Sequence, residues 1–174
     1  SYLENSMNLL YFIADVFAER RYTGNQLAVF PYATGLSDDE MQEIAREMHF
    51  SETTFITSQD QDNQIYGVRI FTPEHEVPFA GHPVLGTAQV IQTEILKDNL
   101  SQITLNVPAG TVIVSFITDD AGNGLVWMRQ NEPAFFQRFT SADLSPVLSL
   151  SDSAIDERFP IEEVSTGLPF IIVP

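Results

Sequence analysis

The segment that follows Pro83 constrains the fold most, because it is apolar on nearly every side. We expect it to form a helix that runs to about residue 95 or 96, with small residues such as Gly86 among larger ones. A helix that is hydrophobic all round is normally enclosed by other elements rather than laid on a surface. The sequence therefore predicts a central helix that is surrounded by the strands flanking it in the chain.

The approach to this helix has the sequence F-T-P-E-H-E-V-P-F-A-G-H-P over residues 71–83. Pro83 suits the first turn of a helix, where its missing N–H group would be unpaired in any case. A helix start presents free backbone N–H groups and a partial positive charge, so it can hold an anion. Gly81 lets a ligand approach the backbone closely. The pattern predicts that this turn binds a carboxylate or a similar anion, with His82 beside it.

Composition narrows the class of protein. The 174 residues are 44% hydrophobic, which allows one domain, or one and a half smaller ones, with a sizeable core. The net charge of −16 argues against a nucleic-acid partner, because it repels phosphate backbones. The lack of cysteine excludes disulfides, thiolate metal sites and cysteine catalysis, and it fits the reducing cytoplasm. No apolar run reaches the roughly 18 residues that span a bilayer, so no membrane partner is expected.

Ser37 opens the clearest surface helix, because Ser37 and Glu40 make an S-x-x-E capping box. An apolar stripe follows at helical spacing, and the helix is expected to end near His49. Strands are expected over residues 9–17, 26–30, 53–57, 64–71, 102–107, 111–117, 125–128 and the end of 164–174. The segment 58–63 is interpreted as a polar loop, and 130–160 as loop-like with a weak helix near 141–150. Residues 1–6 are interpreted as a cloning remnant before Met7.

Six segments in order resemble the PhzF family of phenazine-biosynthesis isomerases. They are D-V-F-A at 15–18, T-G-N-Q-L-A-V-F at 23–30, L-S-D-D-E-M-Q-E-I-A-R-E-M at 36–48, S-E-T-T-F-I at 51–56, F-T-P-E-H-E-V-P-F-A-G-H-P-V-L-G-T-A at 71–88 and V-S-T-G-L-P-F-I-I-V-P at 164–174. The resemblance implies an α+β, diaminopimelate epimerase-like fold, with a strand layer curled around a central helix in each of two domains.

The same resemblance sets the expected domain organisation. Residues 7–124 would form the first epimerase-like domain, and 125–174 only the opening strands of an incomplete second one. The active site of the family lies in the cleft between the domains. The family's second acidic residue and second anion-binding helix start have no counterpart before Pro174.

Glu52 matches the catalytic carboxylate of the family in its S-E-T-T-F motif. A carboxylate between a helix end and an apolar strand can be partly desolvated, and burial raises its pKa toward the range of a general acid or base. Residue type alone favours an exposed residue of a helix–strand turn for Glu52, since most glutamates are exposed, and the family match favours the catalytic role instead.

For the other candidate site residues, a structural role is again the alternative to a functional one. Gly81 and His82 match the substrate-binding turn of the family, whereas His82 could instead be a helix N-cap or a buried structural imidazole. Asn25 is a candidate for substrate contact through its amide, or else a left-handed turn residue after Gly24. Asp15 is expected to accept hydrogen bonds from nearby backbone amides. No metal site is predicted, because His75 and His82 lack a third ligand of known spacing.

Together these features predict a cofactor-independent isomerase or epimerase that shifts a proton on a small carboxylate-bearing substrate. Glu52 would act as the acid/base, and Gly81, His82, Pro83 and Asn25 would bind the substrate. Activity is expected to need the second-domain half, and a homodimer or a second chain that completes that domain is expected. The alternative is a binding or interaction protein that retains the fold without catalysis.

Overall fold

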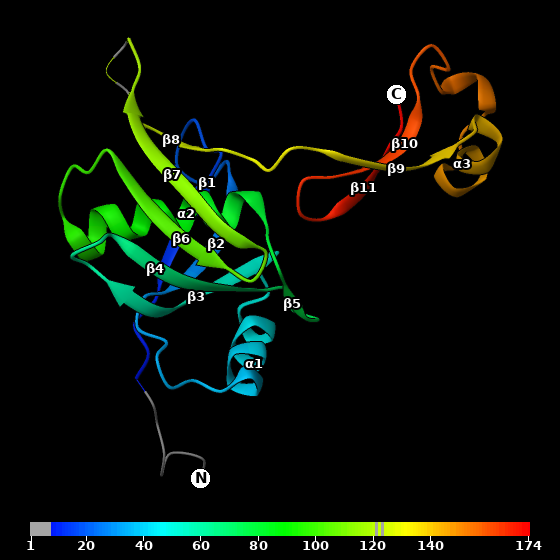
Figure 1. The fold of residues 1–174 in the computed structure, drawn as a ribbon. Coiled ribbons are helices and arrows are strands. Elements are labelled where there is room, and N and C mark those ends of the chain that lie inside the picture. Colours follow the sequence, from blue (N-terminus) through cyan, green and yellow to red (C-terminus); the bar gives the residue numbers. More distant parts are fainter. Residues whose placement is uncertain (1–7, 121, 123) are drawn as a thin grey trace. The chain divides into compact units, whose positions relative to one another are not determined.

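The computed structural model describes residues 8–120, 122 and 124–174, so the expected cloning remnant and Met7 lie outside the described residues. The chain divides into two compact units, Ser1–Arg129 and Gln130–Pro174 (Figure 1). This division falls later than the one after residue 124 that the sequence suggested. The reason is that the strand Gly124–Met128 pairs antiparallel with Gly110–Thr118, which ties it to the first unit.

The described residues of the first unit form one sheet, two α-helices and one π-helix. Its elements in chain order are β1 (Phe12–Val16), β2 (Asn25–Phe30), α1 (Asp38–Met48), β3 (Glu52–Asp60), β4 (Ile65–Phe71), β5 (Glu76–Val77), α2 (Gly81–Val90), the π-helix η1 (Ile91–Leu96), β6 (Gln102–Val107), β7 (Gly110–Thr118) and β8 (Gly124–Met128). The eight strands follow the order β1-β2-β3-β4-β6-β7-β8, with β5 paired to β4. The pairs β2–β3 and β4–β6 are parallel, and the other pairs are antiparallel.

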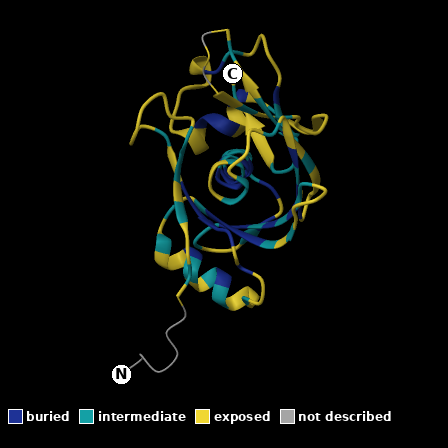
Figure 2. Ribbon diagram, turned by 90° about the vertical axis from the view of Figure 1, so that its left-hand side faces the viewer, coloured by how far each residue is buried: buried dark blue, intermediate teal, exposed yellow. Residues whose placement is uncertain are grey.

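The sheet curls around α2, which Figure 2 shows end-on inside the ring of strands. The inner face of the sheet and the helix share one apolar core, in which Leu27 of β2 and Ile56 of β3 pack with Val84 and Ala88 of α2. Because successive strand residues point to opposite faces, the neighbours of these residues face outward. The prediction of a strand layer curled around a central helix is confirmed.

The outer face of the sheet carries α1. Phe30, Phe55 and Phe71 point outward from β2, β3 and β4 and pack against Met41 and Ala45 of the helix. The capping box predicted at Ser37 is present, and the helix ends at His49 in a left-handed conformation. This cluster is separate from the inner core, so the sheet is covered by apolar side chains on both faces.

Several boundaries differ from the expected ones. The strand β3 continues to Asp60, so the first residues of the expected loop 58–63 are paired with β4. The strand Gln102–Val107 and the strand that follows it, both expected close to these bounds, form an antiparallel hairpin. None of the helices in the described ranges is long and apolar enough to cross a membrane.

The second unit has its own small sheet. Its elements are β9 (Ala134–Phe139), α3 (Ser141–Leu148), the 3-10 turn η2 (Asp152–Ala154), β10 (Ile161–Ser165) and β11 (Pro169–Ile172). The helix near 141–150 was predicted correctly, but β9 lies within a stretch expected to be loop-like. Its sequence A-F-F-Q-R-F has no alternation, and five of its six residues are exposed, so no burial pattern marked it. The three strands follow the order β11-β10-β9. Leu144, Ile155 and Ile161 form the small core of this unit.

Candidate active site

Strand register brings two of the sequence-predicted residues together. The parallel pair β2–β3 aligns Leu27 with Glu52. Asn25 shares a face with Leu27, and Glu52 shares a face with Ile56, because residues two apart on a strand point the same way. Since Leu27 and Ile56 face α2, Asn25 and Glu52 also face it, at the ends where their strands begin. The start of α2 lies at that same end.

The imidazole of His82 meets both side chains. Its Nε2 atom lies 3.2 Å from Oε2 of Glu52, and its Nδ1 atom lies 3.3 Å from Nδ2 of Asn25. The exposed fractions of the His82 and Glu52 side chains are 10% and 19%. The structure thus gathers Glu52, His82 and Asn25 into one cluster, although they are spread over 57 positions of the chain.

The contact between Glu52 and His82 is close but not fully formed. Both Oε2 of Glu52 and Nε2 of His82 are shielded from solvent, and neither has a protein hydrogen-bond partner with acceptable geometry. The 3.2 Å separation therefore describes proximity rather than an aligned hydrogen bond. Buried polar atoms without partners are uncommon and call for an explanation. A ligand that donates to the carboxylate and accepts from the imidazole would satisfy both atoms.

Burial shifts both groups toward their neutral forms. It raises the pKa of the Glu52 carboxyl above its ordinary value. It also lowers the pKa of the His82 imidazole, an effect that a hydrogen bond to the backbone of Gln26 partly opposes. A carboxyl group with a raised pKa holds and releases a proton more evenly near neutral pH, which suits acid/base chemistry.

The start of α2 is open. Its N-cap is Ala80, which has no side chain to accept a hydrogen bond, and no acidic residue lies in the first turn. Val84 is the first residue whose N–H group bonds back, to the carbonyl of Ala80 at 3.3 Å. Pro83 has no N–H group, so Gly81 and His82 supply the free amides of the first turn. Such amides, with the positive end of the helix dipole, can bind a carboxylate.

These placements settle three of the structural alternatives. Glu52 is not an exposed turn residue, because it is the first residue of β3 and is largely buried. His82 is the second residue of α2, so it is not the N-cap. Asn25 is the first residue of β2 and does not adopt a left-handed conformation.

Asp15 organises the turn that precedes Asn25. Its two carboxylate oxygens accept hydrogen bonds from the N–H groups of Thr23 and Gly24, both at 3.0 Å, as the sequence suggested. Gly24 is needed for close packing rather than for a left-handed turn conformation. Its φ angle is not positive, but an added Cβ would lie 2.3 Å from the carbonyl oxygen of Val16. The glycine therefore serves close backbone packing, which no local turn signal reveals.

Two contacts that sequence reasoning missed fix the position of α2. Thr54 of β3 and Thr87 of α2 are both fully buried, and their hydroxyl oxygens lie 2.8 Å apart. At Gly86 an added Cβ would come within 2.7 Å of side-chain atoms of Leu27 and Val16. Both contacts join segments far apart in the chain, so a single sequence offers no signal for them.

The approach loop before α2 is fastened separately from the cluster. Thr72 accepts hydrogen bonds from the N–H groups of Glu74 and His75, both of which are exposed. Arg69 holds Glu76 through two hydrogen bonds at 2.6 and 2.8 Å. In the part of the chain that the structure describes, no group of three or more His, Asp and Glu side chains is placed to hold a metal ion.

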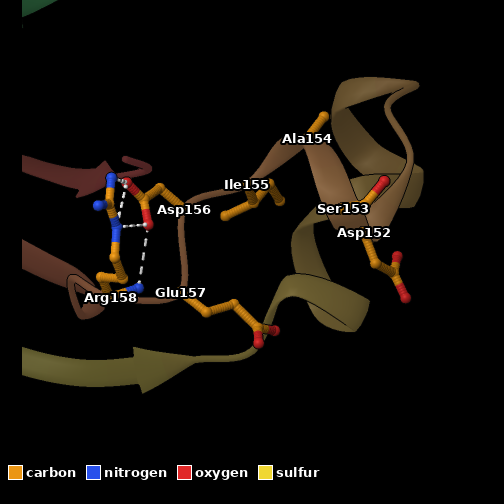
Figure 3. A pocket seen from close by; sticks show the side chains of 7 residues that line it. All are labelled: Asp152, Ser153, Ala154, Ile155, Asp156, Glu157 and Arg158. Atoms are coloured by element: carbon orange, nitrogen blue, oxygen red, sulfur yellow. Dashed lines mark hydrogen bonds and ion pairs between the residues drawn. The ribbon is translucent and has the colours of Figure 1, made fainter.

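The second unit has a hollow of its own, lined by residues 152–158 (Figure 3). Asp156 and Arg158 form an ion pair there, with Nη2 of the arginine 2.6 Å from the carboxylate. Figure 3 shows this pair at one side of the hollow and the carboxylates of Asp152 and Glu157 away from it. None of the five sequence-predicted site residues lines this hollow.

Comparison with known families gives a direct result. The model of phenazine biosynthesis-like proteins, PhzC-PhzF, matches residues 14–174. The chain belongs to the PhzF family. It is 38% identical over 163 residues to the trans-2,3-dihydro-3-hydroxyanthranilate isomerase of Pseudomonas aeruginosa, with 94% of this chain and 56% of that protein covered.

Solved structures agree with this family assignment. A predicted epimerase from Pseudomonas aeruginosa has a TM-score of 0.85 and 35% identity, with 96% of this PhzF-family chain and 59% of that one covered. A probable proline racemase from Agrobacterium radiobacter has a TM-score of 0.59 at 12% identity and covers 94% of this chain and 52% of that one. That likeness extends to the fold alone, and with it the predicted α+β, diaminopimelate epimerase-like fold is confirmed.

The PhzF-family chain spans little more than half the length of these relatives. Its predicted cluster of Glu52, His82 and Asn25 lies within the matched region. The catalytic and substrate-binding roles of these residues, and of Gly81 and Pro83, remain predictions.

Proposed function

We propose that the chain carries the proton-transfer half of a cofactor-independent isomerase that acts on a small carboxylate-bearing substrate. The observation that supports this most is the buried contact between Glu52 and His82 beside the open start of α2. It combines an acid/base group of raised pKa with amides that can hold an anion. The names of the isomerase relatives point to the same class of reaction.

In the proposed reaction, the substrate carboxylate accepts hydrogen bonds from the N–H groups of Gly81 and His82. The Glu52 carboxylate removes a proton from a carbon atom, and the electron pair of that C–H bond delocalises into an adjacent unsaturated system. The protonated Glu52 then returns the proton to another carbon, so that a double bond moves and no atom is gained or lost. Exclusion of water strengthens the electrostatic interactions that stabilise the intermediate charge.

Activity is proposed to need a second wall for this site. Relatives are longer than this chain, which covers 56% of the isomerase and 59% of the predicted epimerase. We propose that the second-domain half of such a protein, in the same polypeptide, a homodimer partner or a second chain, covers the substrate opposite α2.

The test is solvent exchange at carbon. The protein, together with its second-domain half, is incubated in heavy water with trans-2,3-dihydro-3-hydroxyanthranilate and with a panel of unsaturated and hydroxylated carboxylic acids, and deuterium in each acid is measured by mass spectrometry. Glu52→Gln is expected to lower incorporation by at least ~100-fold, since acid/base catalysis is typically worth that much. Substrate affinity, measured by calorimetry, is expected to remain close to that of the wild type.

Glu43→Gln is the matched control, because Glu43 is an exposed glutamate of α1 on the outer face of the sheet. Its incorporation rate should equal that of the wild type. Retention of the rate in Glu52→Gln within roughly threefold would remove Glu52 from the mechanism. Absence of exchange by the wild type with every acid would instead support a binding protein that retains the fold.

A further inference from the structure

The two ring nitrogens of His82 face chemically different partners. Nδ1 lies 3.3 Å from Nδ2 of Asn25, and Nε2 lies 3.2 Å from Oε2 of Glu52. With the amide nitrogen of Asn25 turned toward the ring, as in the structure, Nδ1 is the acceptor, because an amide nitrogen can only donate. A neutral imidazole that accepts at Nδ1 carries its hydrogen at Nε2. The hydrogen is then on the nitrogen that faces Glu52.

Contacts with β1 and Asp15 hold the backbone around Asn25 in place. Asn25 begins β2 and pairs with Val16 of β1. The two residues before it donate their N–H groups to Asp15 at 3.0 Å each. Gly24 packs against the carbonyl of Val16 so closely that no side chain fits there. The turn therefore fixes the backbone position from which the Asn25 side chain extends toward the first turn of α2.

We propose that Asn25 is a positioning residue that holds His82 as the neutral tautomer with its hydrogen on Nε2. This role acts through His82 and differs from the direct substrate contact that the sequence suggested. It deepens the proposed isomerase function, on which its catalytic meaning rests. The Nε2 hydrogen would be directed toward Glu52 and any substrate atom between them, and would orient the carboxylate that moves the proton.

The same contact disfavours the imidazolium form. A protonated ring would carry a hydrogen on Nδ1 and direct it at the hydrogens of the Asn25 amide. Burial of His82 acts in the same direction, because it lowers the pKa of the imidazole and outweighs the opposing hydrogen bond to the backbone of Gln26. The titratable group that faces the ring is Glu52 on β3, whose burial also favours its neutral form.

The test reads the tautomer directly. The protein contains three histidines, so long-range proton–nitrogen spectra of the ¹⁵N-labelled chain show three imidazoles. His49→Gln and His75→Gln assign their signals, because both residues are exposed and lie outside the cluster. At a pH where His82 is neutral, its signals are expected to show hydrogen on Nε2 in excess. One ordinary hydrogen bond corresponds to roughly a two- to tenfold preference.

Two variants then change the contact in opposite ways. Asn25→Ala removes the donor and should lower the preference of His82 for hydrogen on Nε2. Asn25→Asp replaces the donor by an acceptor, which should move the hydrogen to Nδ1 and raise the pKa of His82. The signals of His49 and His75 should not move in either variant, which serves as the internal control.

The wild-type spectrum alone can overturn the proposal, whether or not a variant folds. Hydrogen found mainly on Nδ1 of His82 would mean that Asn25 presents its oxygen and has no such role. An unchanged His82 spectrum in a folded Asn25→Asp variant would overturn it as well. Neither measurement requires turnover, so failure of the proposed isomerase activity leaves this test intact.

Discussion

The two main helices of the first unit begin in opposite ways. The start of α1 is closed by its own side chains: Ser37 and Glu40 satisfy each other's backbone amides. The start of α2 has Ala80 at the N-cap and Pro83 at the third position, so the sequence cannot form a capping box there. The closed helix lies on the outer face of the sheet, and the open one is surrounded by it. An unsatisfied helix start beside buried polar groups therefore marks the candidate site better than any single motif.

The helices also differ in how they are packed. The apolar residues of α1 form one stripe toward the sheet, and Glu43 and Glu47 lie exposed to solvent. Six of the ten residues of α2 are buried, among them Gly86 and Thr87. A substitution on α1 can thus be accommodated toward solvent, whereas one on α2 meets the sheet. This contrast leads to the prediction with the largest effect on stability.

Gly86→Ala is expected to destabilise the fold by about 1–3 kcal/mol, the usual cost of overpacking a core. The added methyl group would lie 2.7 Å from atoms of Leu27 and Val16, and Leu27 is completely buried. The measurement is urea-induced unfolding followed by circular dichroism. Glu43→Ala on the exposed side of α1 is the matched control and should change stability by less than about 0.5 kcal/mol. Equal stability of the two variants would show that α2 has room that the structure does not indicate.

The sequence alone predicted much of this contrast. The capping box at Ser37, the apolar nature of the segment after Pro83 and the chemistry of a helix start are all local, and periodicity or residue type reveals them. The convergence of Asn25, Glu52 and His82 is not local. It depends on the parallel register of β2 and β3 and on the position of α2 against the sheet, which the contact of Thr54 with Thr87 helps to fix.

The resemblance to the PhzF family named Glu52 and His82 but could not give their geometry. The missed strand β9 has another cause. Five of its six residues are exposed, so it carries no burial pattern that a reading of the sequence could detect. Where a side chain's surroundings come from distant segments, residue type and spacing give only the candidate.

Substitutions that add a capping side chain to α2 or remove one from α1 are expected to have intermediate effects on stability and substrate binding. Ala80→Ser would place a hydroxyl acceptor at an extended N-cap, where it can accept from the N–H group of His82. We expect it to stabilise the fold by about 1 kcal/mol, and to weaken substrate binding several-fold because one free amide becomes occupied. Ser37→Ala, the reverse change on α1, should cost about 1 kcal/mol without affecting substrate affinity. Thermal unfolding and calorimetric titration of both variants check this, and tighter binding by Ala80→Ser would contradict an anion site at α2.

The smallest expected effect is on the pH dependence of stability. Glu40 and Glu52, the glutamates nearest the starts of α1 and α2, should contribute to this dependence with opposite signs. Hydrogen bonds from the backbone and side chain of Ser37 lower the pKa of Glu40, whereas burial raises the pKa of Glu52. A lowered pKa gives stability that is present above the ordinary glutamate value, near 4.3, and is lost as the pH falls through the folded-state pKa. A raised pKa gives stability that is present below that value and is lost as the pH rises through the folded-state pKa.

Glu40→Gln and Glu52→Gln separate these contributions. Relative to the wild type, Glu40→Gln should become progressively less stable as the pH rises from about 3 to about 5, where the wild type gains its favourable charge, and the difference should then stay level. As the pH rises further, from about 4 to about 7, Glu52→Gln should become relatively more stable, because it no longer has to keep a charged carboxylate buried. Urea unfolding at four pH values measures both trends. The imidazole of His82, whose pKa is lowered, contributes stability that is lost as the pH falls below its ordinary range, and this contribution is the same in the wild type and in Glu40→Gln. If the stabilities of the two variants changed with pH in the same direction, Glu52 would be solvated in the folded protein. That result would count against Glu52 as the acid/base group.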